Sequence, residues 1–253
     1  MSVHRSLADP LAGGRPTPTR LNDIIQALVS RRVPQTSEPR VLDAGCGLGG
    51  VMLDLVGRFG GTAVGLTLSP AQAQEARRAA ERAGLSSRVD VLVQSYDYPP
   101  VGPFDLVIAI ESLAHSADPD KSVGALADRV APGGLLIIVD DMPEPGAESS
   151  DDLARFKSGW RCPVLWSVAR YQAALRASGR AVEVLDLTAE CRPRELAAIQ
   201  RLERWNRVAH AIVPLTGCRS TLASYAGGLA LERLYRRGLM RYCLVVATGA
   251  TKP

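Results

Sequence analysis

The glycine-rich segment VLDAGCGLGG at residues 41–50 carries the clearest chemical signal in the sequence. Gly45, Gly47 and Gly49 allow the backbone to pass close to a bound nucleoside and its amino-acid tail. Asp43 lies two residues before the first of these glycines, where its carboxylate can order the turn and receive an ammonium group directly or through water. A helix is expected to follow the turn, so its N-terminus would favour a ligand carboxylate.

The same segment also satisfies the GxGxxG spacing of dinucleotide-binding proteins, with Gly45, Gly47 and Gly50. Two details favour a cofactor that carries an amino acid. Asp43 would repel a pyrophosphate, and the next strand ends at Thr67, where a nicotinamide enzyme usually presents an acid to the ribose. A nicotinamide oxidoreductase stays an alternative, although the sequence shows no obvious second half-sheet.

Two side chains are candidates for catalysis. Glu111 follows a predicted strand over 104–110, at the carboxyl edge of the sheet where ligands bind in open α/β folds. Its carboxylate could stabilise developing positive charge and accept a proton, or it could cap the following segment or contact the cofactor. His115, four residues later, could be the base, orient Glu111 or bond a backbone carbonyl.

Other polar and aromatic residues carry weaker signals. Asp140 and Asp141 end a predicted strand and could bind a metal ion, but no third ligand stands at useful spacing, so we expect no metal. Five aromatic residues could line a pocket or serve only in packing; they are Trp160, Trp166, Trp205, Tyr171 and Tyr225.

Helix and strand signals alternate along the first part of the chain. Such alternation is typical of parallel strands with crossover helices. The segments 144–165 and 192–236 break this pattern, the first as loop or short helices and the second as largely helical. The patterns predict helices over 18–31, 51–59, 70–83, 119–130 and 168–177, and strands over 40–43, 62–68, 89–94, 104–110, 135–140, 182–187 and 239–247.

Composition sets further bounds. The 253 residues include no apolar stretch of the ~18–20 residues needed to span a bilayer, and the N-terminus lacks the apolar core of a secretory signal. We therefore expect a cytoplasmic protein. The five cysteines are odd in number and lack CxxC spacing, which favours reduced thiols. A net charge of +4 is too weak to indicate a nucleic-acid partner.

Charge is unevenly distributed. Residues 191–241 contain ten arginines and three glutamates, with neither lysine nor aspartate. The surplus could be a solvated helix face, or it could face an anionic group of the substrate or an acidic membrane surface.

Several motifs occur in order: DAGCG at 43–47, GLTLSPAQ at 65–72, FDLV at 104–107 and ESLAH at 111–115. Together they resemble the γ-tocopherol methyltransferase group of class I S-adenosylmethionine-dependent methyltransferases, which is related to the sterol and cyclopropane-fatty-acid methyltransferases. LYRRGLMRY at 234–242 is similar to that group's entry into its last strand. The resemblance runs from about residue 40 to 248 and is weaker over 144–230.

The resemblance implies an α/β fold: a Rossmann-like seven-stranded methyltransferase sheet with an antiparallel last strand, helices on both faces and a helical lid inserted before that strand. We accordingly expect a flexible arm over 1–16, a core over 17–143 that binds the cofactor, and a third part, 144–253. This last part would hold the substrate-binding helices or lid and the last two strands.

The resemblance also implies S-adenosyl-L-methionine as cofactor, with Asp43, Gly45 and Gly47 at its methionine part and Thr67 and Leu68 beside its ribose. In such proteins the third strand often ends in an acid that holds the adenine amino group. Here Ser95 stands at that position, so either Ser95 or Asp97 would bond adenine. The full set of predicted cofactor contacts is Asp43, Gly45, Cys46, Gly47, Thr67, Leu68, Gln72, Ser95, Tyr96, Asp97 and Ile110.

We therefore predict an enzyme that transfers a methyl group to carbon of a small lipophilic aromatic or isoprenoid metabolite, which could also carry an anionic group. A carbon acceptor passes through a cation and must lose a proton, which gives Glu111 and His115 their predicted catalytic roles. Nitrogen or oxygen methylation on the same scaffold is the near alternative, and a non-catalytic binding protein the distant one. We expect the chain to be a monomer or a homodimer. Peripheral contact with a membrane stays an alternative.

Overall fold

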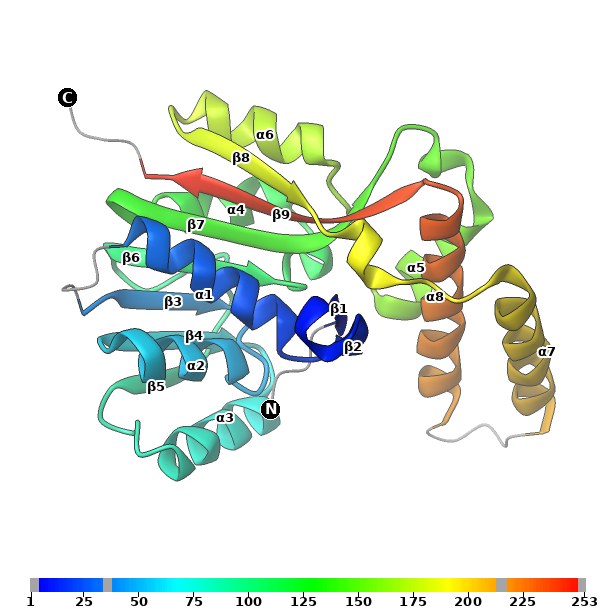
Figure 1. Cartoon of the computed structure of the whole chain (residues 1–253), viewed down its shortest axis with the longest axis horizontal. Helices are drawn as coiled ribbons and strands as arrows, with labels where there is room; N and C mark the ends of the chain where they lie inside the picture. Colours follow the sequence, from blue (N-terminus) through cyan, green and yellow to red (C-terminus); the bar gives the residue numbers. More distant parts are fainter. Residues whose placement is uncertain (1–4, 34–37, 213–217, 250–253) are drawn as a thin grey trace.

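A seven-stranded sheet forms the centre of the computed structural model, which describes residues 5–33, 38–212 and 218–249 (Figure 1). The strand order is β5-β4-β3-β6-β7-β9-β8, and β9 runs antiparallel to both of its neighbours. This order confirms the expected methyltransferase-type sheet. The strands are β3 (Arg40–Ala44), β4 (Thr62–Thr67), β5 (Val89–Val93), β6 (Phe104–Ile110), β7 (Val130–Pro143), β8 (Ala181–Asp186) and β9 (Met240–Thr248).

Helices cover both faces of the sheet, so its central strands are nearly continuous apolar runs. Alternate residues along each strand face opposite layers: Leu106 packs with α1, α2 and α3, whereas its neighbour Val107 packs with α4 and α6. The helices of the two layers are α1 (Arg20–Arg32), α2 (Gly50–Phe59) and α3 (Pro70–Arg82) on one face, and α4 (Pro119–Ala127) and α6 (Val168–Ala177) on the other.

Local sequence signals set the helix starts. Ser69 accepts a hydrogen bond from the Gln72 amide at 3.3 Å, and Pro70 follows as the first residue of α3. The predicted boundary at 119–130 was wrong at its end: α4 stops at Ala127. Val130 already pairs with Phe104 as the start of β7, so that strand begins five residues before the predicted position.

The N-terminal segment differs from the expected flexible arm over 1–16. Of that arm, the structure describes residues 5–16, which form most of an antiparallel hairpin of β1 (Leu7–Asp9) and β2 (Arg15–Thr17). Leu7 is fully buried in the main core, and the Asp9 carboxylate accepts a hydrogen bond from the Leu11 amide at 2.9 Å. All three residues of β1 are buried, and the strand packs against α1 and the turn Thr188–Cys191.

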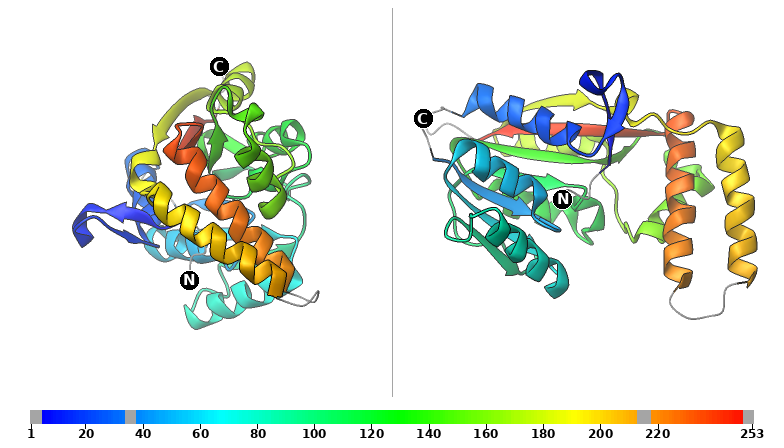
Figure 2. Two further views of the ribbon diagram at one scale, coloured as in Figure 1. Left: turned by 90° about the vertical axis from the view of Figure 1, so that its right-hand side faces the viewer. Right: turned by 60° about the horizontal axis from the view of Figure 1, so that its bottom comes forward.

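Three further helices stand beyond the carboxyl edge of the sheet: α5 (Asp151–Trp160), α7 (Leu196–Ile212) and α8 (Cys218–Arg236) (Figures 1 and 2). The backbones of α5 and α8 cross closely, because a Cβ on Gly159 would lie 2.5 Å from the Ala223 carbonyl oxygen. Arg233 of α8 pairs with Asp152 of α5 at 2.6 Å and also with Glu203 of α7. We call these contacts the Arg233 bridge.

Two sequence expectations concern features that the structure describes only in part. Within the described ranges, no helix is both long and apolar enough to cross a bilayer. The described thiols are free; they belong to Cys46, Cys162, Cys191 and Cys243, and the Cys218 side chain lies outside the described set.

Candidate functional site

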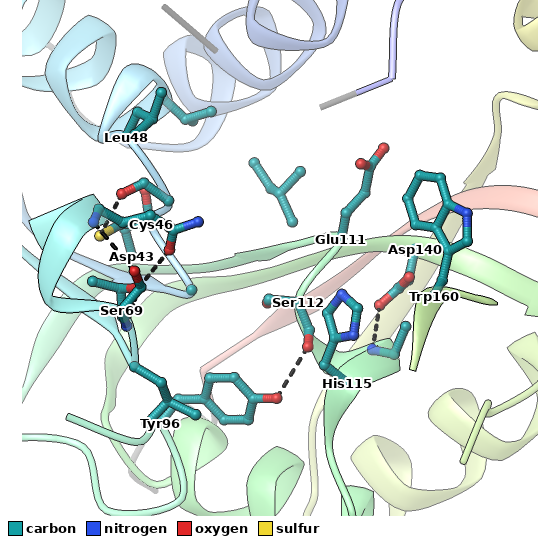
Figure 3. Close-up of a pocket in the computed structure, with 18 of the residues that line it drawn as sticks. Asp43, Cys46, Leu48, Ser69, Tyr96, Glu111, Ser112, His115, Asp140 and Trp160 are labelled. Atoms are coloured by element: carbon teal, nitrogen blue, oxygen red, sulfur yellow. Dashed lines mark hydrogen bonds between the residues drawn. The ribbon is translucent and has the colours of Figure 1, made fainter. Parts of the chain in front are cut away.

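A cavity of about 580 Å³ opens at the carboxyl ends of β3, β4, β6 and β7, with α5 on its far side (Figure 3). This is the place where ligands bind in open α/β sheets. Its lining residues are Asp43, Gly45, Cys46, Gly47, Leu48, Gly50, Val51, Thr67, Leu68, Ser69, Gln72, Gln94, Tyr96, Ile110, Glu111, Ser112, Ala114, His115, Asp140, Asp141, Phe156, Trp160 and Cys162.

The glycine turn forms the floor of the cavity. Gly45 has a φ of 92°, and a Cβ at this position would lie 2.4 Å from the Cβ of Ser112. Its amide and that of Cys46 both donate to the Leu66 carbonyl, at 2.9 and 2.8 Å. The Ser112 hydroxyl donates to the Ala44 carbonyl at 2.7 Å. The turn is therefore fastened to β4 on one side and to the segment after β6 on the other.

Asp43 contributes a buried carboxylate at the end of β3, with 3% of its surface exposed. Burial raises the pKa of Asp43 to about 7, although a hydrogen bond from the Met52 amide opposes the shift. A ligand ammonium group would supply the positive charge that favours the ionised form. The geometry therefore fits a cofactor that carries an amino acid better than one that carries a pyrophosphate.

The end of β4 offers polar and apolar contacts to a ligand. The Thr67 hydroxyl donates to the Gln72 side-chain oxygen at 2.7 Å and accepts from the Ser69 amide at 3.2 Å. Leu68 lines the cavity with 72% of its surface exposed, so a ligand ring could cover it. Thr67, Leu68 and Gln72 thus lie together, as the sequence suggested.

The end of β5 differs from the predicted arrangement. Tyr96 lines the cavity, and its hydroxyl donates to the Ser112 carbonyl at 3.0 Å. Ser95 and Asp97 are not lining residues: the Ser95 hydroxyl accepts from the Asp97 amide at 3.1 Å, and the Asp97 carboxylate accepts from Ser122 at 2.5 Å. Gln94, which the sequence reasoning missed, faces the cavity instead.

Glu111 lies at the opposite end of the cavity from the glycine turn. Its φ of 48° is in the left-handed region, which directs the chain sharply away from β6. The carboxylate oxygen Oε1 accepts hydrogen bonds from the Tyr242 hydroxyl at 2.8 Å and from the Arg5 amide at 2.9 Å. Burial and the nearby charge of Asp141 raise the pKa of Glu111, and the two hydrogen bonds oppose that shift.

Arg5 completes this end of the site, a role that the sequence did not suggest. Its guanidinium lies 3.5 Å from an Asp141 carboxylate oxygen and over the rings of Tyr235 and Tyr242, at 5.0 and 5.5 Å from their centres. The Tyr235 hydroxyl donates to the same carboxylate. No local motif marks Arg5, because all of these partners are distant in the sequence.

The paired acids do not form a metal centre of the usual kind. Asp140 is buried, and its two oxygens accept from the amides of Ala114 and Asp141 at 2.8 and 2.9 Å. Burial and the charge of Asp141 raise its pKa well above the ordinary aspartate value. Within the residues described, no three His, Cys, Asp or Glu side chains come together as metal ligands.

His115 lines the cavity but contacts a backbone carbonyl rather than Glu111. Its Nδ1 lies 3.3 Å from the Arg161 carbonyl oxygen and 4.0 Å from the Cys162 sulfur. Of the predicted roles for His115, the structure shows the backbone contact. Its imidazole remains exposed at the cavity wall.

Trp160 is the one of the five candidate aromatic residues that lines the cavity. Phe156, which was not among the candidates, also lines it. Trp166 and Tyr171 pack edge to face in the second core, with ring centres 5.1 Å apart. Trp205 and Tyr225 lie on the surface, away from the lining.

None of the described arginine side chains of 191–241 lines the cavity either. The acidic lining groups are four carboxylates, which belong to Asp43, Glu111, Asp140 and Asp141, and His115 also lines the cavity. The prediction that lid arginines contact an anionic group of the substrate is therefore not supported by the described geometry. Five of these arginines pair instead with protein acids: Arg194, Arg233, Arg236, Arg237 and Arg241.

Comparison with known proteins agrees with this arrangement. A family model described as a methyltransferase domain matches residues 17–206. The chain belongs to the methyltransferase domain family. This methyltransferase domain is 41% identical over 102 residues to a tocopherol O-methyltransferase of Arabidopsis thaliana, a match that covers 40% of this chain and 29% of that protein. It is 36% identical over 134 residues to ajmaline N-methyltransferase of Rauvolfia serpentina, covering 51% and 45%.

Both matches span less than half of the relative's own length. The fold of the methyltransferase domain is also that of geranyl diphosphate C-methyltransferase from Streptomyces coelicolor, with a TM-score of 0.74, 20% identity and coverage of 99% of this chain and 90% of that chain. These three proteins are named as methyltransferases of oxygen, nitrogen and carbon, so the similarity does not indicate which kind of atom is methylated.

Proposed function

We propose that the protein is an S-adenosylmethionine-dependent methyltransferase of a small lipophilic metabolite. The observation that carries the proposal is the charge of the cavity: a buried Asp43 stands at the glycine turn, and carboxylates stand at both ends without a lining arginine or lysine among the described residues. S-adenosylmethionine carries an ammonium and a sulfonium group, so both of its cationic groups fit this lining. When bound, the cofactor would supply an electrophilic methyl group for in-line displacement.

Three parts of the cavity would hold the cofactor. Asp43 receives the ammonium group, while Gly45 and Gly47 allow close approach of the backbone. Thr67, Leu68 and Gln72 border the ribose. Gln94 and Tyr96 are better placed than Ser95 or Asp97 to contact adenine, because only the first pair faces the cavity. Cys46 and Ile110 complete the wall.

The acceptor would occupy the end of the cavity formed by Glu111, His115 and Trp160. We infer that the acceptor atom is a carbon of an aromatic or isoprenoid compound. Among the described residues, the hydrogen bonds that Glu111 accepts come from Arg5 and Tyr242 and both fall on Oε1. Oε2 would then stabilise a cationic acceptor and remove its proton. Asp141, close to Glu111, adds negative charge to this end.

The two main parts of the chain would have different roles. Residues 17–143 would bind the cofactor, since they supply the glycine turn and the ends of β4 and β5. Residues 144–253 would enclose the acceptor, since α5 places Phe156 and Trp160 in the wall. Nitrogen or oxygen methylation stays the second candidate, favoured by the names of the two relatives.

Calorimetric titration with S-adenosylhomocysteine and, separately, with NAD is the direct test. Micromolar binding of S-adenosylhomocysteine alone would support the proposal and justify a screen of prenylated phenols, terpenoids and amines as methyl acceptors. Binding of NAD alone would overturn it. Tight binding of S-adenosylhomocysteine without transfer to any acceptor would favour a binding protein that has kept the fold.

A further inference from the structure

Four side chains form a basic and aromatic stripe along α7: Arg201, Arg204, Trp205 and Val208. Their spacing of three and four residues puts them on one side of the helix. All four are exposed, Trp205 by 73% and Val208 by 49%. We call this surface the α7 stripe.

The opposite side of α7 packs against the protein. Ile199 is fully buried there, and the Asn206 side chain donates to the Leu222 carbonyl at 3.3 Å. Glu203, the only acidic residue of α7, turns inward to pair with Arg233. The α7 stripe therefore keeps its arginines without an acid on the same helix face.

This surface differs from the rest of the arginine-rich segment. The described arginine side chains of α8 and β9 are held by acids, as in the pair of Arg236 with Glu195 at 2.6 Å. No ion pair joins Arg201 or Arg204 to any acid within the described residues. The helix that carries the stripe lies on the outside of the helical region: in the left view of Figure 2, α7 lies in front of α8 and faces the viewer.

We propose that the α7 stripe docks the protein on a lipid surface that contains anionic headgroups. Arginine side chains pair with headgroup phosphates while their stems lie along the apolar boundary, and an indole ring prefers the same interfacial depth. Val208 adds apolar contact beside the ring. An anionic polymer such as nucleic acid would satisfy the arginines but would not need the exposed valine, so the mixed character favours the membrane.

Docking through α7 would also bring the acceptor cavity close to a source of lipophilic molecules. The Arg233 bridge connects α7 through α8 to α5, which supplies Trp160 to the cavity wall. The lipid surface would then deliver an apolar acceptor. Only this last step rests on the proposed function; the docking itself does not.

Vesicle co-sedimentation of the full chain tests the proposal without any use of catalysis. The protein should sediment with vesicles of phosphatidylcholine and phosphatidylglycerol, less with phosphatidylcholine alone, and less as salt rises. The variant R201Q/R204Q should bind about 25-fold more weakly, because each arginine near an anionic surface changes binding about fivefold. The matched control is R31Q/R82Q, which removes the same charge from exposed positions on α1 and α3 and should bind like the wild type.

Trp205 offers a second, residue-specific readout. Brominated lipids should quench the tryptophan emission of the wild type on vesicles, and the W205F variant should lose that quenching although Trp160 and Trp166 remain. Equal loss of binding in both arginine variants would overturn the proposal, as would absence of binding at low salt. A lower molecular mass in sedimentation for W205F than for the wild type, both measured without vesicles, would show instead that a second copy of the chain covers the stripe. Binding to S-adenosylhomocysteine, measured in parallel, reports separately on the proposed function.

Discussion

The backbone amide of Arg5 donates a hydrogen bond to the carboxylate of Glu111 at 2.9 Å, across 106 residues of sequence. The Arg5 guanidinium also pairs with Asp141 on the neighbouring strand. The N-terminal hairpin is therefore part of the candidate site, because it supplies both a donor and a positive charge to the acidic end of the cavity.

Arg5→Ala should alter the pH dependence of methyl transfer more than cofactor binding. The guanidinium is a positive charge beside Glu111, Asp141, Tyr235, Tyr242 and Cys191. Its loss should raise the pKa of Glu111 further, since a nearby cation favours the carboxylate. If Glu111 acts as a base, the rise of kcat with pH should then move to higher pH.

The Arg5→Lys variant should restore part of the profile, because it restores the charge. Arg15→Ala on β2 is the matched control, since Arg15 is an exposed arginine of the same hairpin. An unchanged profile in Arg5→Ala, with S-adenosylhomocysteine binding intact, would show that Arg5 does not influence the reacting end of the site.

Glu111→Gln should reduce kcat about 100-fold or more if the carboxylate removes a proton from a carbon acceptor. The amide keeps the size of the side chain and can still accept from Tyr242 and Arg5, so the affinity for S-adenosylhomocysteine should change little. Single-turnover transfer and calorimetry separate the two effects. A variant that transfers methyl groups at nearly the wild-type rate would rule out the carbon mechanism and favour an amine or hydroxyl acceptor.

Asp43→Asn should weaken cofactor binding while stabilising the free protein at pH 8. The carboxylate must ionise to receive an ammonium group, so with a pKa of about 7 the wild-type affinity for S-adenosylhomocysteine should increase between pH 6 and pH 8. The variant should show no such increase. Because the folded pKa of Asp43 lies above its unfolded value, ionisation opposes folding as pH rises, and the neutral amide should raise Tm at pH 8.

For Asp43→Asn, we expect a lower affinity for S-adenosylhomocysteine together with a higher Tm at pH 8. Parallel loss of affinity and of Tm in the Asp43→Asn variant would mean that the substitution disturbs the turn itself. A wild-type affinity that is flat between pH 6 and pH 8 would contradict the raised pKa.

Gly45→Ala should lower the free energy of unfolding by about 2–4 kcal/mol, because a Cβ here combines backbone strain with a clash against Ser112. Gly84→Ala is the control: its φ of 70° is also left-handed, but a Cβ there meets nothing within 4 Å. Gly84→Ala should lower the free energy of unfolding by only ~1–2 kcal/mol, because it adds backbone strain without a clash. Urea unfolding of both variants gives the difference, and equal values would show that the floor of the cavity yields to the added methyl group.

Local patterns predicted most of the sheet and half of the site. The strand over 104–110 was predicted at its observed bounds, since its apolar run is buried on both faces, and the glycine turn was recognised from residue types alone. Ser95 was predicted as a cofactor contact, but Gln94 and Tyr96 line the cavity and Ser95 does not. Which residue faces the cavity depends on how the chain turns after β5, and the sequence spacing does not determine that turn.

Contacts between distant segments were beyond local patterns. Arg5 acquires its place through Glu111 and Asp141, and Arg233 finds its partner in Asp152 on another helix. Both arginines look like ordinary surface charges in the sequence. The surplus over 191–241, which includes Arg233, was interpreted as a solvated helix face or as a surface for an anionic group of the substrate or an acidic membrane. The structure shows that Arg233 joins three helices and that Arg194, Arg236, Arg237 and Arg241 also pair with acids of the protein.

The Arg233 bridge also limits how the cavity can admit a molecule. Since Asp152, Arg233 and Glu203 tie three helices together, and Gly159 brings the backbones of α5 and α8 into contact, a backbone movement of α5 that withdraws Trp160 would carry α7 and α8 with it. We expect the entrance to widen through rotation at the chain connections that flank this group, 144–150, 161–167, 192–195 and 237–239, without melting of any helix. Acceptor size should then respond to changes at those connections as strongly as to changes in the wall itself.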